Sequence, residues 1–165
     1  MRGYDPAAWE PFFTALIAAA AALTGLLFVA VSINLSTILK RAKFLPARAA
    51  ETLATLLLIV VSSGLALVPQ STRLLGVEIV IVMVPMLLIT VWRQVSYRRQ
   101  NHDDPLLWTI SRMISTAMAT VPGTVAGLSL AGHWGGGFYW LAAAALLGIL
   151  GASYNAWVLL IEITR

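Results

Sequence analysis

Five long apolar segments constrain this chain more than any other feature of its sequence. They cover residues 12–39, 50–68, 75–95, 106–131 and 138–163. A helix needs about 20 residues to cross the roughly 30 Å of hydrocarbon in a bilayer, and each segment is of about that length or longer. Hydrophobic residues make up 59% of the chain and charged residues only 11%. One soluble core of this size cannot enclose so much apolar surface, whereas lipid solvates it directly. The sequence therefore predicts an all-α integral membrane bundle of about five transmembrane helices.

The connections between the segments predict a single transmembrane domain that takes up the whole chain. Residues 69–74 and 132–137 are short turns, so the helices that they join are expected to be antiparallel neighbours. Residues 40–49 and 96–105 form longer and charged connections. No linker, repeat or shift in composition divides the sequence into two parts.

The basic residues predict which way the helices run through the membrane. Nine of the eleven Lys and Arg residues fall on the side of the two charged connections: Lys40, Arg41, Lys43, Arg48, Arg93, Arg98, Arg99, Arg112 and Arg165. Only Arg2 and Arg73 fall on the other side. Because basic residues are retained on the cytoplasmic side, the N-terminus is expected outside and the C-terminus inside. The expected partner of the basic side is then the anionic inner leaflet, and the formal charge of +4 requires no nucleic acid.

The tryptophans support the same orientation. Three fall near the predicted inner interface and three near the outer one: Trp92, Trp108 and Trp157, then Trp9, Trp134 and Trp140. Aromatic side chains gather at both interfaces of membrane-spanning helices. The positions of the tryptophans therefore agree with the orientation that the basic residues predict.

The sequence lacks the patterns on which most enzymes and metal sites depend. It has no cysteine, and its two histidines, His102 and His133, lie too far apart for a metal-ligand motif. It also lacks a Gly-x-Ser-x-Gly motif, a His-Glu-x-x-His motif, a phosphate-binding glycine loop and a carboxylate pair placed for acid–base catalysis. We therefore expect neither an enzyme nor a bound metal or cofactor.

Small residues gather in the first and the last apolar segments. Ala18, Ala22 and Gly25 lie in the first, and Gly148 and Ala152 form a small-xxx-small pair in the last. Such spacing lets two helices approach each other closely in lipid. Both helices are therefore expected to be interior rather than lipid-facing. Packing within one bundle and packing between subunits both remain open.

The fourth segment carries a polar stripe. Arg112, Thr116, Thr120 and Thr124 recur every four residues and therefore share one helix face. If copies of this helix met around an axis, the threonine hydroxyls could line a narrow aqueous path, and Arg112 at its cytoplasmic mouth would favour anions. Packing is the alternative, because threonine can bond a carbonyl of its own helix and small polar residues join helices. For Arg112 a further alternative is that its side chain reaches the inner headgroups.

The first segment becomes polar toward its predicted inner end, where it contains Ser32 and Asn34. An amide is costly to leave in lipid, so Asn34 is expected to face protein or a water-filled cavity. A hydrogen bond to another helix and a role as a gate or substrate contact both remain open for this residue.

The first segment also carries the residues by which this chain resembles a known family. They read FF at 12–13, AAAAA at 18–22, LTGLLFVA at 23–30 and SINL at 32–35, with weaker similarity in LPAR at 45–48 and GGGFYWL at 135–141. These stretches resemble small multi-pass membrane proteins that are common in actinobacteria, have no characterised function and are loosely labelled modulators of a membrane-anchored AAA protease. The resemblance implies a multi-pass protein of the bacterial cytoplasmic (inner) membrane.

Two functional hypotheses follow. The small size, the small-residue helices and the polar stripe favour a homo-oligomeric channel or passive transport protein for small ions, anions among them. Several copies would be needed, since one five-helix bundle is too slight to enclose a pore readily. The alternative is a non-catalytic accessory or regulatory subunit of another membrane complex, such as a membrane protease, which requires no water path.

Overall fold

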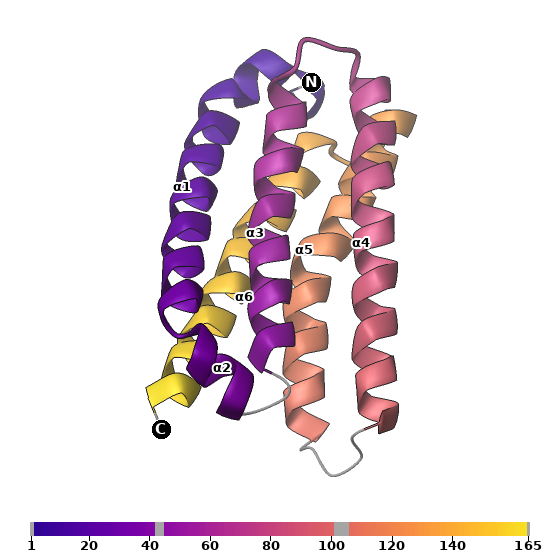
Figure 1. Ribbon diagram of the computed structural model, residues 1–165. Coiled ribbons are helices and arrows are strands. Elements are labelled where there is room, and N and C mark those ends of the chain that lie inside the picture. Colours follow the sequence, from indigo (N-terminus) through magenta and orange to yellow (C-terminus); the bar gives the residue numbers. More distant parts are fainter. Residues whose placement is uncertain (1, 42–44, 101–105, 165) are drawn as a thin grey trace.

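The computed structural model describes residues 2–41, 45–100 and 106–164. Within these ranges every regular element is a helix: η1 (Arg2–Tyr4), α1 (Pro6–Ile33), α2 (Leu35–Arg41), α3 (Leu45–Leu67), α4 (Thr72–Gln100), α5 (Leu106–Gly132) and α6 (Phe138–Thr164). Five of them, α1 and α3 to α6, are long and apolar enough to cross a membrane (Figure 1). The prediction of an all-α bundle with five membrane-spanning helices is confirmed.

The five long helices stand side by side (Figure 1). We call the end that holds the N-terminus the upper end, and the end that holds α2 and the C-terminus the lower end. Helices α1, α4 and α6 run from the upper to the lower end, and α3 and α5 return. Helix α5 packs between α4 and α6, whereas α1 packs mainly along α3 and makes few contacts with α6. Helix α1 is therefore the most peripheral of the five.

The ends of the bundle differ in charge as the sequence predicts. Within the described part of the chain, the upper-end elements contain Arg2 and Arg73, and all other arginines belong to the lower half. Trp9, Trp134 and Trp140 also fall at the upper end. The direction in which this charged axis crosses a membrane remains a prediction of the positive-inside rule.

Helix α1 and the first predicted span, about residues 12–39, have different bounds. Helix α1 already begins at Pro6, because Asp5 caps it by accepting a hydrogen bond from the Ala7 amide at 3.2 Å and proline is favoured at the first helical position. At the other end the chain breaks at Asn34, whose side-chain amide donates to the Ala30 carbonyl at 2.9 Å. The Asn34 backbone amide donates to the same carbonyl at 3.3 Å, and α2 starts after this residue.

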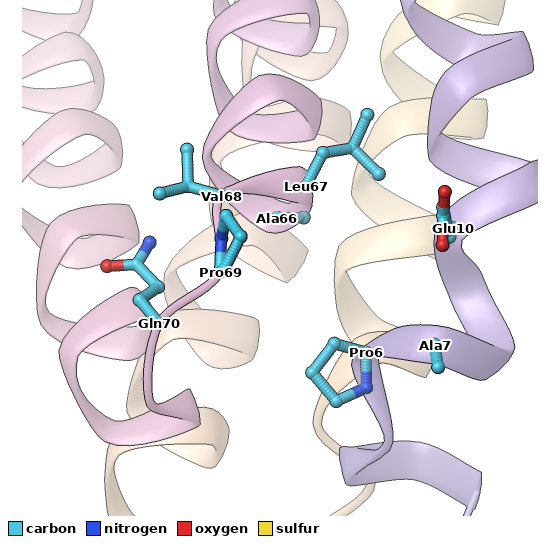
Figure 2. A pocket seen from close by; sticks show the side chains of 8 residues that line it. All are labelled: Pro6, Ala7, Glu10, Ala66, Leu67, Val68, Pro69 and Gln70. Atoms are coloured by element: carbon cyan, nitrogen blue, oxygen red, sulfur yellow. The ribbon is translucent and has the colours of Figure 1, made fainter.

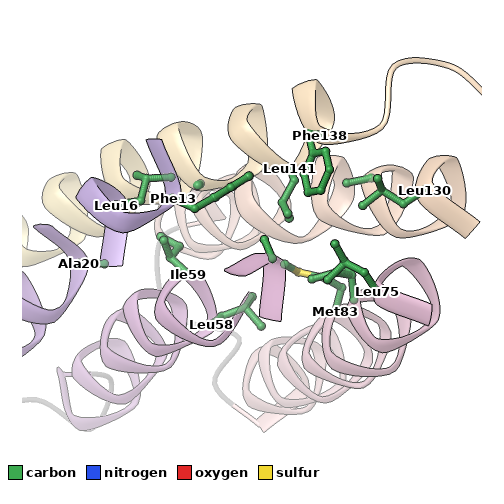
Figure 3. Close-up of a cluster of buried hydrophobic side chains, with 14 residues drawn as sticks. Phe13, Leu16, Ala20, Leu58, Ile59, Leu75, Met83, Leu130, Phe138 and Leu141 are labelled. Carbon is green, nitrogen blue, oxygen red and sulfur yellow. The ribbon is translucent and has the colours of Figure 1, made fainter. Parts of the chain in front are cut away.

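The upper half of the bundle has an apolar core to which all five long helices contribute. Its buried side chains include Phe13, Ile79, Met83, Leu130 and Phe138 (Figure 3). The rings of Phe13 and Phe138 join α1 to α6, with centroids 5.7 Å apart. Because lipid solvates apolar surface as well as a core does, close packing rather than transfer out of water stabilises this region.

The closest approach between α4 and α5 depends on Gly76 and Gly127. A Cβ atom on Gly76 would lie 2.6 Å from the Gly127 carbonyl oxygen and would clash with the backbone nitrogen of Ala131. A Cβ atom on Gly127 would lie 2.9 Å from the Gly76 carbonyl oxygen. The two backbones are thus in direct contact, as small residues allow between membrane helices.

We therefore expect Gly76→Ala to lower the free energy of unfolding by about 1–3 kcal/mol, because backbone atoms cannot move aside as a flexible side chain can. The matched control is Gly64→Ala on α3, where a Cβ atom meets nothing within 4 Å. Unfolding of both variants in detergent micelles measures the difference. Equal stability of Gly76→Ala and wild type would contradict the close contact.

Candidate functional site

The lower half of the bundle has a second, smaller apolar cluster, together with a layer of buried polar side chains. We call the latter the buried polar layer, and its members come from α3, α4, α5 and α6: Arg48, Glu51, Gln94, Arg112, Thr116 and Asn155. Glu51 and Arg112 each lie six residues inside their helices, which is about 9 Å at 1.5 Å per residue. Helix α5, with 27 residues, is about 40 Å long and exceeds the roughly 30 Å hydrocarbon by about 5 Å at each end. The layer therefore falls inside the hydrocarbon, near its lower boundary.

An ion pair between Glu51 and Arg112 lies at the centre of the layer. Nε of Arg112 donates to Oε2 of Glu51 at 3.0 Å, and Nη2 donates to Oε1 at 2.5 Å. The two side chains are only 9% and 6% exposed. The alternative that Arg112 reaches the lipid headgroups is therefore wrong. A carboxylate at the same depth and in two-pronged geometry stabilises the guanidinium where it is buried.

Helix α4 adds two side chains to this pair. The Gln94 amide nitrogen donates to Glu51 Oε2 at 3.4 Å and to Thr116 Oγ1 at 3.3 Å. The Tyr97 ring lies 5.6 Å from the guanidinium carbon of Arg112, within range of a cation–π interaction. The carbonyl oxygen of Gln94 is buried and accepts no hydrogen bond from the described part of the chain. The pair thus joins three helices, α3, α4 and α5.

Helix α6 joins the layer through Asn155. Its side-chain oxygen accepts two hydrogen bonds from Arg48, from Nε at 3.2 Å and from Nη2 at 2.9 Å. Both residues are buried, at 3% and 6% exposure. Arg48 and Glu51 share one face of α3, so the two sets of hydrogen bonds lie one helical turn apart.

Sequence reasoning missed four residues of the layer: Arg48, Glu51, Gln94 and Asn155. Arg48 falls in the predicted connection 40–49, and Glu51, Gln94 and Asn155 fall in three different apolar segments. No sequence motif therefore connects the four residues. One signal could have found Glu51. A buried arginine within a membrane span needs a partner, and Glu51 is an opposite charge at the depth of Arg112.

The threonine stripe lies inside the single bundle. Thr116 and Thr120 are 5% and 1% exposed. The Thr120 hydroxyl donates to the Thr116 carbonyl at 2.8 Å, and the Thr124 hydroxyl donates to the Thr120 carbonyl at 2.8 Å. Such bonds from threonine to its own helix are those expected if the stripe serves packing rather than an aqueous path. An axis formed by this face of several α5 helices would require α3 and α4 to move away from it.

The two polar residues predicted at the inner end of the first span lie outside the layer. Ser32 is exposed on α1, and Asn34 is half-buried at the junction of α1 and α2. The bond from Asn34 to the Ala30 carbonyl stays within its own helix. The structure therefore does not bring Ser32 or Asn34 to the threonine stripe.

The small residues of α6 pack within the bundle. A Cβ atom on Gly148 would lie 3.0 Å from both the Ala119 Cβ and the Ile59 Cδ1. Ala152 is 3% exposed. Helix α6 therefore uses its small-xxx-small pair to approach α5 and α3 closely.

The small residues of α1 are exposed instead. Ala18, Ala22 and Gly25 face away from the bundle, and a Cβ atom on Gly25 would meet nothing within 4 Å. Of the two alternatives for these three residues, the structure does not show packing within one bundle, and packing between subunits stays a prediction. The opposite side of α1, which holds Phe13 and Leu16, faces the bundle, because these larger side chains fill the space beside α3 and α6.

A network of hydrogen bonds closes the upper end. The Tyr4 hydroxyl lies 3.4 Å from the Ser129 hydroxyl and accepts a bond from the Gly136 amide at 3.1 Å. The Gly137 amide donates to Ser129 at 2.8 Å. Gly136 and Gly137 have φ angles of 113° and 54°, which glycine adopts without strain. The network ties the N-terminus to the α5–α6 turn.

A cavity of about 230 Å³ also opens at the upper end, between the start of α1 and the α3–α4 turn (Figure 2). It is lined by Pro6, Ala7, Glu10, Ala66, Leu67, Val68, Pro69 and Gln70. Gln70 donates a hydrogen bond to Glu78 at 2.8 Å, and Glu10 is exposed. Within the described residues no three His, Cys, Asp or Glu side chains are grouped so that they could hold a metal ion.

The comparisons with known proteins assign no family. No protein-family model, no curated protein and no solved structure matches this chain. The resemblance carried by the first apolar segment therefore remains a prediction, and the function has to be argued from the geometry.

We expect Glu51→Gln to lower the free energy of unfolding by about 3–5 kcal/mol, because it leaves the guanidinium of Arg112 buried without its carboxylate. Arg112→Gln should cost a similar amount. The double variant Glu51→Leu, Arg112→Leu should be much more stable than the sum of the two losses implies.

Unfolding in detergent micelles measures these differences, and Glu10→Gln, at an exposed carboxylate, is the control. Single variants as stable as this control would show that the pair does not hold α3 to α5.

Proposed function

We propose that this protein is a non-catalytic accessory subunit that regulates another complex in the same membrane and binds it through α1. The proposal rests on the exposed α1 face, which we define as Ala15, Ala18, Ala22, Gly25, Val29 and Ser32. All six residues are exposed, and they follow one another at alternating intervals of three and four positions. This is the heptad spacing of a seam between two helices.

The size of these residues distinguishes the exposed α1 face from the rest of the lipid-facing surface. On α3 to α6 most exposed residues are large, among them Leu57, Ile81, Leu88 and Leu150, although a few, such as Ser153, are small. Large side chains keep lipid and protein partners at a distance from the backbone, whereas Ala and Gly let another helix approach closely. Seams with three–four spacing cross at about 20°. The exposed α1 face is therefore suited to one further membrane helix.

The buried polar layer favours the role of an accessory subunit over a role in transport. Its central carboxylate, guanidinium and amide nitrogen bind one another across α3, α4 and α5. Hydrogen bonds of this kind fix how helices pack in a membrane. In this proposal the layer holds a rigid body from which α1 is presented to the partner.

The resemblance of the first segment provides a candidate for the partner, a membrane-anchored AAA protease. The resembling residues, 18–30 and 32–35, include most of the exposed α1 face. A subunit that binds such a protease beside its membrane anchor would alter its assembly or its access to membrane substrates. The resemblance implies that this complex lies in the bacterial inner membrane, and the positive-inside rule predicts that the N-terminus of the present chain is outside.

A photoactivatable cross-linker at Gly25 tests the proposal in the membranes of the native host. We expect one heterologous adduct in stoichiometric yield, because a partner helix on the exposed α1 face would lie within reach. Ala22→Leu should reduce the yield severalfold, since the larger side chain keeps the partner helix away.

The matched control is the same cross-linker at Ser153, an exposed small residue of α6. Adducts with lipid alone at both positions would contradict the proposal. An adduct at Gly25 with a second copy of this chain would also contradict the proposal, and it would show that the exposed α1 face joins copies of this chain in a homo-oligomer.

Passive transport of small ions is the second candidate function. Buried hydroxyl groups continue the polar layer toward the upper end of the bundle: Thr55, Ser62, Ser63, Thr120 and Ser129. The Ser63 hydroxyl has no hydrogen-bond partner within the described part of the chain. A polar path along this column would run inside one bundle rather than around an axis shared by several copies.

Flux measurements on reconstituted liposomes separate the two functions. We expect the wild-type protein to pass no more ions than protein-free liposomes do, at several voltages and pH values, because the hydroxyls of Thr120 and Thr124 are bonded to their own helix. An ion flux that falls severalfold in Thr120→Leu but not in Val121→Leu, a lipid-facing neighbour, would instead establish transport.

A further inference from the structure

An apolar groove separates α1 from α6 in the lower half of the bundle. Its volume is about 290 Å³, and it is lined by Leu23, Leu26, Leu27, Ala30, Asn34, Ala156, Trp157, Leu159 and Leu160. It exists because α1 leans on α3 and makes few contacts with α6. The small side chains of Ala30 and Ala156 leave the space between the two helices unfilled. The groove opens on the lipid-facing surface, as the 59% exposure of Trp157 indicates.

The length of the groove matches one leaflet. Along α1 it extends from Leu23 to Asn34, a rise of about 16 Å at 1.5 Å per residue. This is about half of the roughly 30 Å of hydrocarbon. On the α1 side of the groove, the polar side chain in the lining is that of Asn34 at its lower end, and on the α6 side Trp157 carries an indole N–H. An occupant would therefore be apolar along its length and polar where α1 ends.

The width of the groove excludes a helix. Spread over about 16 Å, the volume corresponds to a mean cross-section of about 18 Å², whereas a helix about 10 Å across needs about 80 Å². One extended hydrocarbon chain fits such a space. The groove lies beside the exposed α1 face, since Leu23 and Leu27 are offset from Ala22 and Gly25 around the helix and Leu26 lies at the border between the two surfaces.

The sequence of α2, the helix that follows the groove, selects the headgroup. Helix α2 begins at Leu35, directly after Asn34, and packs against α3 and α6 below the groove (Figure 1). Its last two residues are Lys40 and Arg41. Basic residues at the membrane surface attract anionic lipids. A phospholipid whose acyl chain entered the groove would thus have its phosphate near α2, whose sequence contains two basic and no acidic residues.

We propose that the groove is a binding site for one anionic phospholipid, which inserts an acyl chain between α1 and α6 and places its headgroup beside α2. The bound lipid completes the packing of α1 on α6 that the protein itself leaves open. This site is independent of the partner proposed for the exposed α1 face.

Native mass spectrometry of the full chain in detergent tests the site with phosphatidylglycerol and phosphatidylcholine of identical acyl chains. We expect one tightly bound phosphatidylglycerol and a preference over phosphatidylcholine of about fivefold for each of the two basic residues. Ala156→Phe should abolish the bound lipid by filling the groove. Lys40→Gln with Arg41→Gln should remove the preference and leave chain binding in place.

Gly25→Leu, on the exposed α1 face, is the control and should bind phosphatidylglycerol as wild type does. Equal binding of the two lipids would overturn the headgroup assignment, and full binding by Ala156→Phe would overturn the groove. If Ala156→Phe does not fold, phosphatidylglycerol with brominated chains decides. The brominated phosphatidylglycerol should quench the fluorescence of Trp157, which is the signal that is lost in Trp157→Phe. It should do so at lower lipid concentrations than brominated phosphatidylcholine. Equal quenching by the two lipids would contradict the proposal.

Discussion

The ion pair between Glu51 and Arg112 is buried within the hydrocarbon, and the lower half of the bundle is arranged around it. Water cannot stabilise either charge there, so each group requires the other at short distance and in two-pronged geometry. Gln94 extends this requirement to α4, and the bond between Arg48 and Asn155 adds α6 one turn away. The relative positions of four helices are therefore set by a few polar contacts.

The upper half of the bundle is held by close packing instead. Aromatic rings join α1 to α6, and the backbones of α4 and α5 touch at Gly76 and Gly127. Apolar side chains gain little by leaving lipid for a protein core, so contact distance determines stability in this half. The polar layer fixes which helices are neighbours, and the glycines fix how closely they approach.

Helix α1 takes part in the packing only along one side. It belongs to the apolar core of the upper half and, through Leu27, to the smaller apolar cluster of the lower half, but contributes no side chain to the buried polar layer. Two surfaces are left uncovered as a result: the exposed α1 face and the groove beside α6. Both proposals for binding, a membrane helix on the first and an anionic phospholipid in the second, follow from this peripheral position.

The sequence by itself determined the number, the type and the approximate bounds of the long helices. Lipid leaves the backbone no hydrogen-bond partner but its own, so length and composition are sufficient for that conclusion. They were not sufficient for α1, which begins after the cap at Asp5 and ends before Asn34. Which residues meet was decided by the tertiary structure alone. Small residues lie at a close helix contact on α6 but on an open surface on α1. Their spacing in the sequence predicts which of them share a helix face, but not whether that face points into the bundle or away from it.

The same limit applies to the charges. The threonine stripe and Arg112 were visible in the sequence as one face of a helix, and the tertiary structure turned that face inward, toward Glu51 and Gln94. A buried guanidinium needs a partner at its own depth, but that partner lies 61 positions away along the chain. Folding alone brings the two together.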